Sequence, residues 1–166
     1  YTLNSTNPAE LEEAKQALIA QKPLVLAYVV DEAKDKMVAG EAALAVVWSG
    51  DAVYAMRENP DLDYVIPVEG GNLWFDGMVI PKTSNNRELA EAFINFLNRT
   101  EIALANTDYI GYSTPHVEAR KLLEPELANN LAAYPEQEDL DNNEVFVHIG
   151  EMLREYDRIW TEIKAY

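Results

Sequence analysis

Cysteine and histidine, two residue types with wide chemical use, are absent or nearly so. The chain has no cysteine and only two histidines among 166 residues. The lack of cysteine excludes disulfides and thiol chemistry and leaves the redox compartment open. His116 and His148 lie far apart in the sequence, without the spacing of metal ligands. We therefore interpret both as surface or helix-end residues and expect neither a metal site nor a cofactor.

Basic residues and long apolar runs are scarce as well. Thirteen Lys and Arg stand against 29 Asp and Glu, which gives a formal net charge of −16. This charge repels nucleic acid and anionic membranes and attracts cations, so no nucleic-acid partner is expected. No apolar run approaches the roughly 20 residues that a membrane span needs. Neither a signal peptide nor a lipid-attachment cysteine is visible, so we expect a cytoplasmic chain or one whose targeting end has been removed.

The apolar runs that are present predict an α/β fold. At 166 residues and 48% hydrophobic composition, the chain fits one ordinary domain or slightly more. Helix-start and helix-stop signals at Asn7, Pro8 and Pro23 bound the first helix. Predicted strands, the first two of them buried, follow at 24–30, 42–48, 64–68 and 70–81, with short helices between the first three. This order predicts a layered architecture with a largely parallel or mixed sheet.

The pattern after Pro81 predicts mainly helices. The expected elements are an amphipathic helix at about 84–97, a shorter helix at 101–107, a loop at 109–115, a helix at 116–123, a solvated acidic connection at 124–143 and a last helix at 144–165. The first of these helices carries Phe93 and Phe96 on its apolar side. The last contains Phe146 in a stripe spaced by threes and fours, which indicates packing.

The main candidate site lies in the strand at 70–81, GGNLWFDGMVIP. Because side chains alternate along a strand, Trp74 and Asp76 share one face. An indole beside a carboxylate suits a ligand that is both cationic and apolar. The ring attracts the charge and covers methylenes, while the carboxylate accepts hydrogen bonds from an ammonium group. The alternative is that Trp74 belongs to the core and Asp76 opens the turn at Gly77.

Two further aromatic residues are candidates. Trp48 ends a predicted strand just before a helix N-terminus, where open α/β sheets place ligands, although an indole there is also typical of a core. Tyr112 lies in the loop, where it either stacks on a ligand or plugs the loop. An enzymatic alternative would use Asp51 and Asp76 as acid and base. No nucleophile–base pair, metal cluster or phosphate loop accompanies those two carboxylates.

Several motifs in a fixed order support a family resemblance. These are VVWSG at 46–50, GGNLWFD at 70–76, the amphipathic helix after it, and IGYSTP at 110–115. In this order they resemble the C-terminal half of the spermidine/putrescine-binding proteins of bacterial ABC importers. The likeness spans all 166 residues but only about half of the usual family chain. Residues 1–8 resemble a mid-chain segment of that family, so we expect this polypeptide to be a fragment.

The resemblance implies the C-terminal part of a type II periplasmic-binding-protein fold, in which two lobes close on a linear polyamine. Residues 1–74 and 121–166 would form the C-terminal lobe, and residues 75–120 would cross the hinge and complete the N-terminal lobe of the full-length protein. The helix bearing Phe93 and Phe96 would then lack its native partner surface. We expect it to dock on a second copy by swapping or to pack against its own lobe.

The resemblance also implies roles for the candidate residues. Trp48 and Trp74 would line the cleft and sandwich the methylene chain. Asp76 would hold an ammonium group, and Tyr112 would pack against the ligand or hydrogen-bond it. The family usually has a glutamine ligand contact just before the last helix, and Phe146 occupies that position here. The remaining contacts, further carboxylates among them, belong to the upstream half of the family chain.

The implied function is capture of spermidine or putrescine for the permease subunits of an ABC importer, without enzymatic activity. Such a protein would lie in the periplasm, or at the outer face of the cell membrane, lipid-anchored, in Gram-positive bacteria. A polyamine sensor that signals to a membrane receptor would use the same scaffold, as would a binding protein for another small cation or amine.

Overall fold

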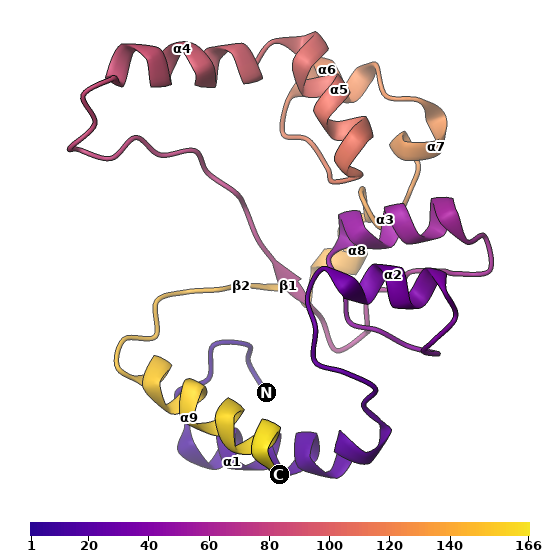
Figure 1. Cartoon of the computed structure of the whole chain (residues 1–166), viewed down its shortest axis with the longest axis vertical. Helices are drawn as coiled ribbons and strands as arrows, with labels where there is room; N and C mark the ends of the chain where they lie inside the picture. Colours follow the sequence, from indigo (N-terminus) through magenta and orange to yellow (C-terminus); the bar gives the residue numbers. More distant parts are fainter.

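The computed structural model describes residues 1–166 and is dominated by helices (Figure 1). In chain order the elements are α1 (Pro8–Gln21), the 3₁₀ helix η1 (Lys22–Leu24), α2 (Glu32–Val38), α3 (Ser49–Glu58), β1 (Asn72–Leu73), α4 (Arg87–Leu97), α5 (Thr100–Ile110), α6 (Val117–Lys121), α7 (Pro125–Ala128), α8 (Gln137–Leu140), β2 (Glu144–Val145) and α9 (Met152–Ala165). Both termini lie at the end formed by α1 and α9, whereas α4 to α7 lie at the opposite end. None of the helices combines the length and apolar character that crossing a membrane requires.

The first and last long helices pack against each other. Asn7 caps α1, because its side-chain oxygen accepts a hydrogen bond from the Ala9 amide at 3.0 Å, and Pro8 occupies the first turn as predicted. Leu11 of α1 is buried in one cluster with Ile159 and Ile163 of α9. This cluster joins segments from the two ends of the sequence.

A second apolar cluster surrounds α3. It contains Ala52 and Val53 of α3 together with residues from 123–133. The prediction of a merely solvated connection at 124–143 is therefore wrong in its first part, since Leu127, Ala132 and Ala133 are buried. These apolar residues lie in one cluster with Ala52 and Val53 and so pack this segment on α3.

The sheet is much smaller than predicted. β1 and β2 pair in parallel, with Asn72 opposite Glu144 and Leu73 opposite Val145. The predicted strands at 24–30, 42–48 and 64–68 are not formed, and Leu44 is 91% exposed rather than buried. A strand is stabilised by the neighbour that takes its backbone hydrogen bonds, and no segment of this chain lies beside these three runs as such a neighbour.

The last helix starts later than predicted. Glu144 and Val145 form β2, and α9 begins only at Met152, so Phe146 belongs to an extended segment and not to the helical stripe. Pairing with β1 competes with helix formation here and prevails. The helix expected at 101–107 instead runs from Thr100 to Ile110 and ends at Gly111, whose φ of 74° suits glycine.

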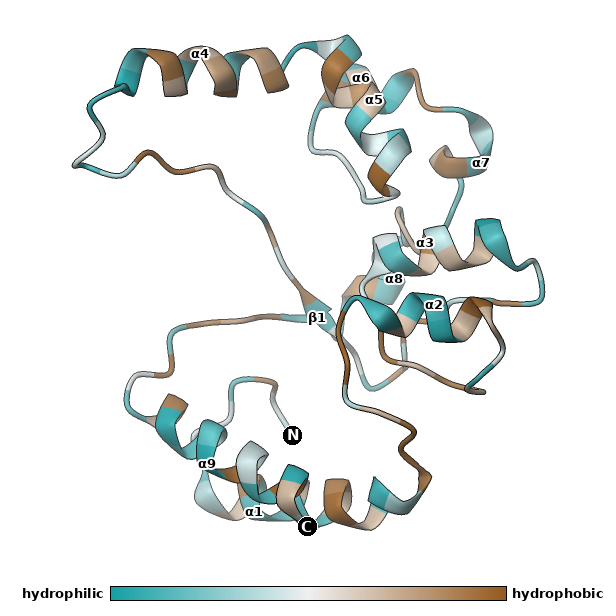
Figure 2. Ribbon diagram, viewed as in Figure 1, coloured by the Kyte–Doolittle hydropathy of each residue, from teal (hydrophilic) through white to brown (hydrophobic).

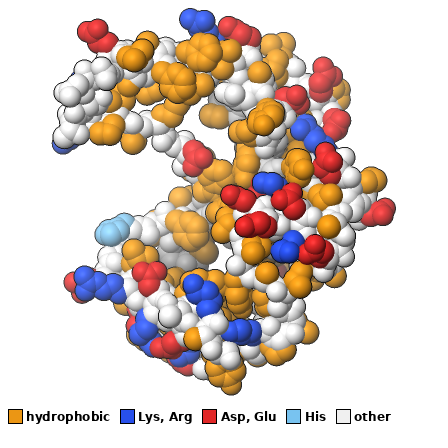
Figure 3. All heavy atoms as spheres, in the orientation of Figure 1, with side chains coloured by type: hydrophobic (Ala, Val, Ile, Leu, Met, Phe, Trp, Pro, Cys, Tyr) orange, Lys and Arg blue, Asp and Glu red, His pale blue; other side chains and the backbone are white.

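Helix α4 leaves its apolar side uncovered. The amphipathic helix is confirmed, yet none of its residues is buried, and Leu89, Phe93 and Phe96 are exposed. Figure 2 shows brown segments along α4, and Figure 3 shows hydrophobic side chains gathered over it. An amphipathic helix is normally stabilised by burying this face, so α4 presents a surface suited to contact with another part of a protein.

The α1–α9 cluster leads to a stability prediction. Ile163 is 1% exposed, so Ile163→Ala is expected to lower the free energy of unfolding by about 2–5 kcal/mol, and Ile163→Val by about 0.5–1.5 kcal/mol. Urea titration followed by circular dichroism measures both. Leu153→Ala on the same helix serves as control, because Leu153 is exposed. Equal effects of Leu153→Ala and Ile163→Ala would show that this cluster does not hold the helices together.

Candidate functional site

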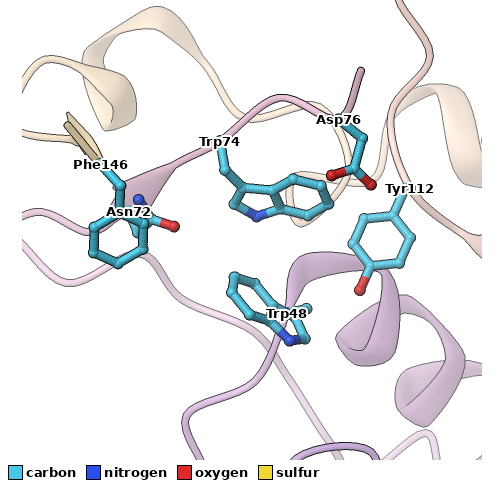
Figure 4. Close-up of a pocket in the computed structure, with 6 residues that line it drawn as sticks. All are labelled: Trp48, Asn72, Trp74, Asp76, Tyr112 and Phe146. Carbon is cyan, nitrogen blue, oxygen red and sulfur yellow. The ribbon is translucent and has the colours of Figure 1, made fainter. Parts of the chain in front are cut away.

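The four side chains singled out in the sequence line one pocket. This pocket has a volume of about 370 Å³, and its lining residues are Trp48, Asn72, Trp74, Asp76, Tyr112 and Phe146 (Figure 4). They come from four separate segments: the residue before α3, β1 and the chain that follows it, the loop after α5, and the residue after β2. A volume of this size is in the range of small-molecule sites.

The β1–β2 pair determines which side chains face the pocket. Asn72, Trp74 and Asp76 alternate along an extended segment and point to the same side, as predicted for the last two. Extending the observed register by one residue puts Trp74 beside Phe146. Phe146 therefore enters the pocket because of strand pairing, and its ring lies at the end of the pocket opposite Asp76.

Three aromatic rings form a connected row. The ring centroids of Trp48 and Trp74 are 5.5 Å apart with planes at 76°, and those of Trp74 and Tyr112 are 5.5 Å apart at 69°. This differs from the predicted sandwich, since the two indoles touch edge to face. Ring quadrupoles favour this arrangement over parallel faces. A hydrocarbon chain can therefore lie along the exposed faces of the rings and not between Trp48 and Trp74 as they stand.

Two glycines position Tyr112. Gly111 ends α5 in the left-handed region and turns the chain so that the next ring reaches the start of α3. A Cβ at Gly50 would lie 2.1 Å from the Tyr112 ring, so only glycine allows this close approach. Tyr112 thus both packs against α3 and lines the pocket.

Acidic side chains surround the tyrosine. Burial, followed by the charges of Asp51, Asp31 and Asp76, raises the pKa of Tyr112 to about 12. The phenol is therefore neutral at physiological pH. Asp51 does not line the pocket, and its carboxylate contacts the ammonium of Lys34 at 3.2 Å. Of the two carboxylates considered for an acid–base pair, only Asp76 lines the pocket.

Two residues that line the pocket, Asn72 and Phe146, were not predicted from the sequence to belong to the site. Asn72 shares a face with Trp74 and Asp76, so the alternation of the strand could have identified it. The sequence predicts Phe146 in the last helix, at a position where the family usually has a glutamine. No local signal could have identified it, because its place depends on pairing between residues 72 positions apart in register.

Comparison with known proteins places the chain in a family. The family described as bacterial extracellular solute-binding protein matches residues 1–135. The chain belongs to this family. A spermidine/putrescine-binding periplasmic protein of Escherichia coli is 37% identical over 165 residues, which are 99% of this chain and 47% of that protein. A protein of the same description from Haemophilus influenzae is 32% identical over 162 residues, 98% of this chain and 45% of that protein.

Solved structures agree with the sequence comparison. A Listeria monocytogenes protein described as a spermidine/putrescine ABC transporter superposes with a TM-score of 0.91 at 43% identity, covering 99% of this chain and 51% of that one. A spermidine/putrescine ABC transporter substrate-binding protein from Streptococcus pneumoniae gives a TM-score of 0.84 at 41% identity, with 100% and 52% covered. The chain thus spans about half the length of the relatives it matches. The predicted resemblance is confirmed, and the fold is part of a type II periplasmic-binding-protein fold.

The close approach of Gly50 and Tyr112 gives a prediction. Gly50→Ala is expected to push the Tyr112 ring out of its place, so that its pKa falls from about 12 toward the ordinary value of 10. Tyrosinate absorbance as a function of pH measures this, and the Tyr112→Phe variant identifies the titration that belongs to Tyr112. Because the pKa is raised on folding, the stability linked to Tyr112 is fully present below about pH 10 and is lost as the pH rises through about 12.

Gly77→Ala is the matched control for that substitution. A Cβ at Gly77 would meet no atom within 4 Å, so the titration of Tyr112 should be unchanged. The same titration curve in Gly50→Ala and in the unsubstituted protein would contradict the proposed close contact.

Proposed function

We propose that the whole protein carrying this chain captures a linear polyamine, spermidine or putrescine, outside the cytoplasm and delivers it to the permease subunits of an ABC importer. One observation carries the proposal: the rings of Trp48, Trp74 and Tyr112 and the carboxylate of Asp76 line a single pocket. The relatives from Escherichia coli and Streptococcus pneumoniae are named for binding these same ligands, and the second also for ABC transport. The protein acts in this proposal as a carrier and not as a catalyst.

The chemistry of the pocket suits a polyamine. Aromatic faces attract ammonium groups and cover the methylenes between them. The Asp76 carboxylate accepts charge-assisted hydrogen bonds from one ammonium group. Tyr112 remains neutral and can donate or accept a hydrogen bond without adding charge. The net charge of −16 adds a general attraction for cations.

The expected free energies of binding indicate that this pocket is one side of a larger site. Each covered methylene contributes about 0.8 kcal/mol, and a hydrogen bond to a charged group contributes about 1.5–3 kcal/mol. Association itself costs an estimated 4–15 kcal/mol. Tight capture therefore needs contacts from an opposing surface, and we assign that surface to the other lobe of a two-lobed protein.

We assign residues 1–74 and 121–166 to the C-terminal lobe, and residues 75–120 to a segment that crosses the hinge and completes the N-terminal lobe. Two features support this. The unpaired apolar runs, 42–48 among them, present free backbone groups that strands of a larger sheet would take. The apolar side of α4 is exposed within the segment 75–120. We expect the remaining lobe of the whole protein to cover both, and place the protein in the periplasm or, lipid-anchored, at the outer face of the membrane.

Hydrogen exchange tests what covers these surfaces. In the whole protein the amides of residues 43–47 are expected to exchange slowly in a monomer, because a larger sheet pairs them. Mass spectrometry measures the exchange, and light scattering measures the oligomeric state. Amides of α1, which are paired within this chain, serve as the internal control. Protection that appears only in a dimer would instead assign the covering surface to a swapped second copy.

Replacing the Asp76 carboxylate tests whether the pocket binds an ammonium group of spermidine. Asp76→Asn is expected to lower the affinity of the whole protein for spermidine by about tenfold or more, because a charge-assisted hydrogen bond is replaced by a neutral one. Titration calorimetry measures the affinity. Asp157→Asn on α9 makes the same change of charge away from the pocket and should leave the affinity unaltered. An equal effect of both substitutions would mean that only overall charge matters.

A further inference from the structure

The side chain of Asn72 shows an unusual pairing of its polar atoms. Its Nδ2 donates to the carbonyl oxygens of Leu73 at 3.3 Å and Glu144 at 3.2 Å. Its Oδ1 is shielded from solvent and has no hydrogen-bond partner, the only buried side-chain atom of this kind in the structure. A shielded acceptor without a partner costs stability, so its position needs an explanation.

The orientation of the amide is determined by its neighbours. Rotating the amide by half a turn would place Oδ1 against two carbonyl oxygens and would lose both donated hydrogen bonds. The NH₂ group is therefore held by the β1–β2 pair, and the oxygen faces the other way. Figure 4 shows this oxygen pointing toward Trp74 and the interior of the pocket.

Asn72 and Asp76 lie on either side of Trp74. The three side chains alternate along one extended segment, in which residues four apart are separated by about 13 Å. Asp76 thus offers an anionic acceptor at one end of the indole, and Asn72 a neutral acceptor at the other. The Phe146 ring lies beside Asn72 and offers no hydrogen-bonding atom, so Asn72 supplies the polar group at that end. Phe146 is 60% exposed, so little packing holds its ring in place beside Asn72.

We propose that Asn72 Oδ1 accepts a hydrogen bond from a second nitrogen of the ligand, while Asp76 holds the first. This inference rests on the proposed polyamine function and deepens it. Two acceptors separated by an indole select an elongated amine with an N–H donor at each end and a hydrocarbon chain between. A ligand with a single amine satisfies Asp76 only and leaves the Asn72 acceptor unpaired.

A comparison of matched ligands tests the role of Asn72. Cadaverine and pentylamine have the same hydrocarbon chain, but only cadaverine carries a second amine. In the whole protein, Asn72→Leu is expected to weaken cadaverine binding by about tenfold or more and to leave pentylamine binding unchanged. Calorimetric titration, by displacement for the weaker ligand, gives the ratio of the two dissociation constants. A loss of packing would weaken both ligands alike and leave that ratio unchanged.

A second variant covers the case in which Asn72→Leu does not fold. Asn72→Ala removes the same acceptor with a smaller side chain and puts no oxygen against the two carbonyls, so it is expected to reduce the preference for cadaverine over pentylamine as Asn72→Leu does. An unchanged preference in whichever variant folds, with cadaverine still bound by the unsubstituted protein, would overturn the role of Asn72 and leave the proposed function standing. Failure of the unsubstituted protein to bind spermidine, putrescine or cadaverine would overturn both.

Discussion

The short parallel pairing of β1 with β2 is the constraint on which the pocket depends. It joins the middle of the chain to a segment near its C-terminal end, and further hydrogen bonds reinforce it. The Glu144 amide donates to the Gly71 carbonyl at 3.0 Å, and the Asn142 side chain donates to the Val68 carbonyl at 2.9 Å. A Cβ at Gly70 would lie 2.0 Å from the Asn142 carbonyl oxygen, so the two segments cross at a distance that requires glycine there.

This pairing also orients the pocket side chains. Once Asn72 and Leu73 are in register with Glu144 and Val145, the alternation of side chains brings Trp74 to the same face as Asn72. The pocket is therefore held by backbone hydrogen bonds and by glycine contacts more than by a large core. The row of edge-to-face rings then links this segment to the start of α3 and to the loop after α5.

The packing of the chain fits a protein whose surfaces are completed by further contacts. Two small apolar clusters hold α1 to α9 and α3 to residues 123–133. The apolar side of α4 and the extended apolar runs remain exposed. Because apolar surface of this kind is stabilised by burial, the arrangement is consistent with the opposing lobe that we propose for the whole protein.

The sequence by itself determined the local features. The cap at Asn7 and the shared face of Trp74 and Asp76 depend on neighbouring residues only, and both were predictable. The gathering of Trp48, Trp74, Asp76 and Tyr112 was predictable from the family resemblance. The tertiary structure alone decided which extended runs find hydrogen-bonding partners, where Phe146 lies and which way the Asn72 amide faces. These depend on segments far apart in the chain, and no local pattern records the partner that a backbone amide or a side-chain oxygen will meet.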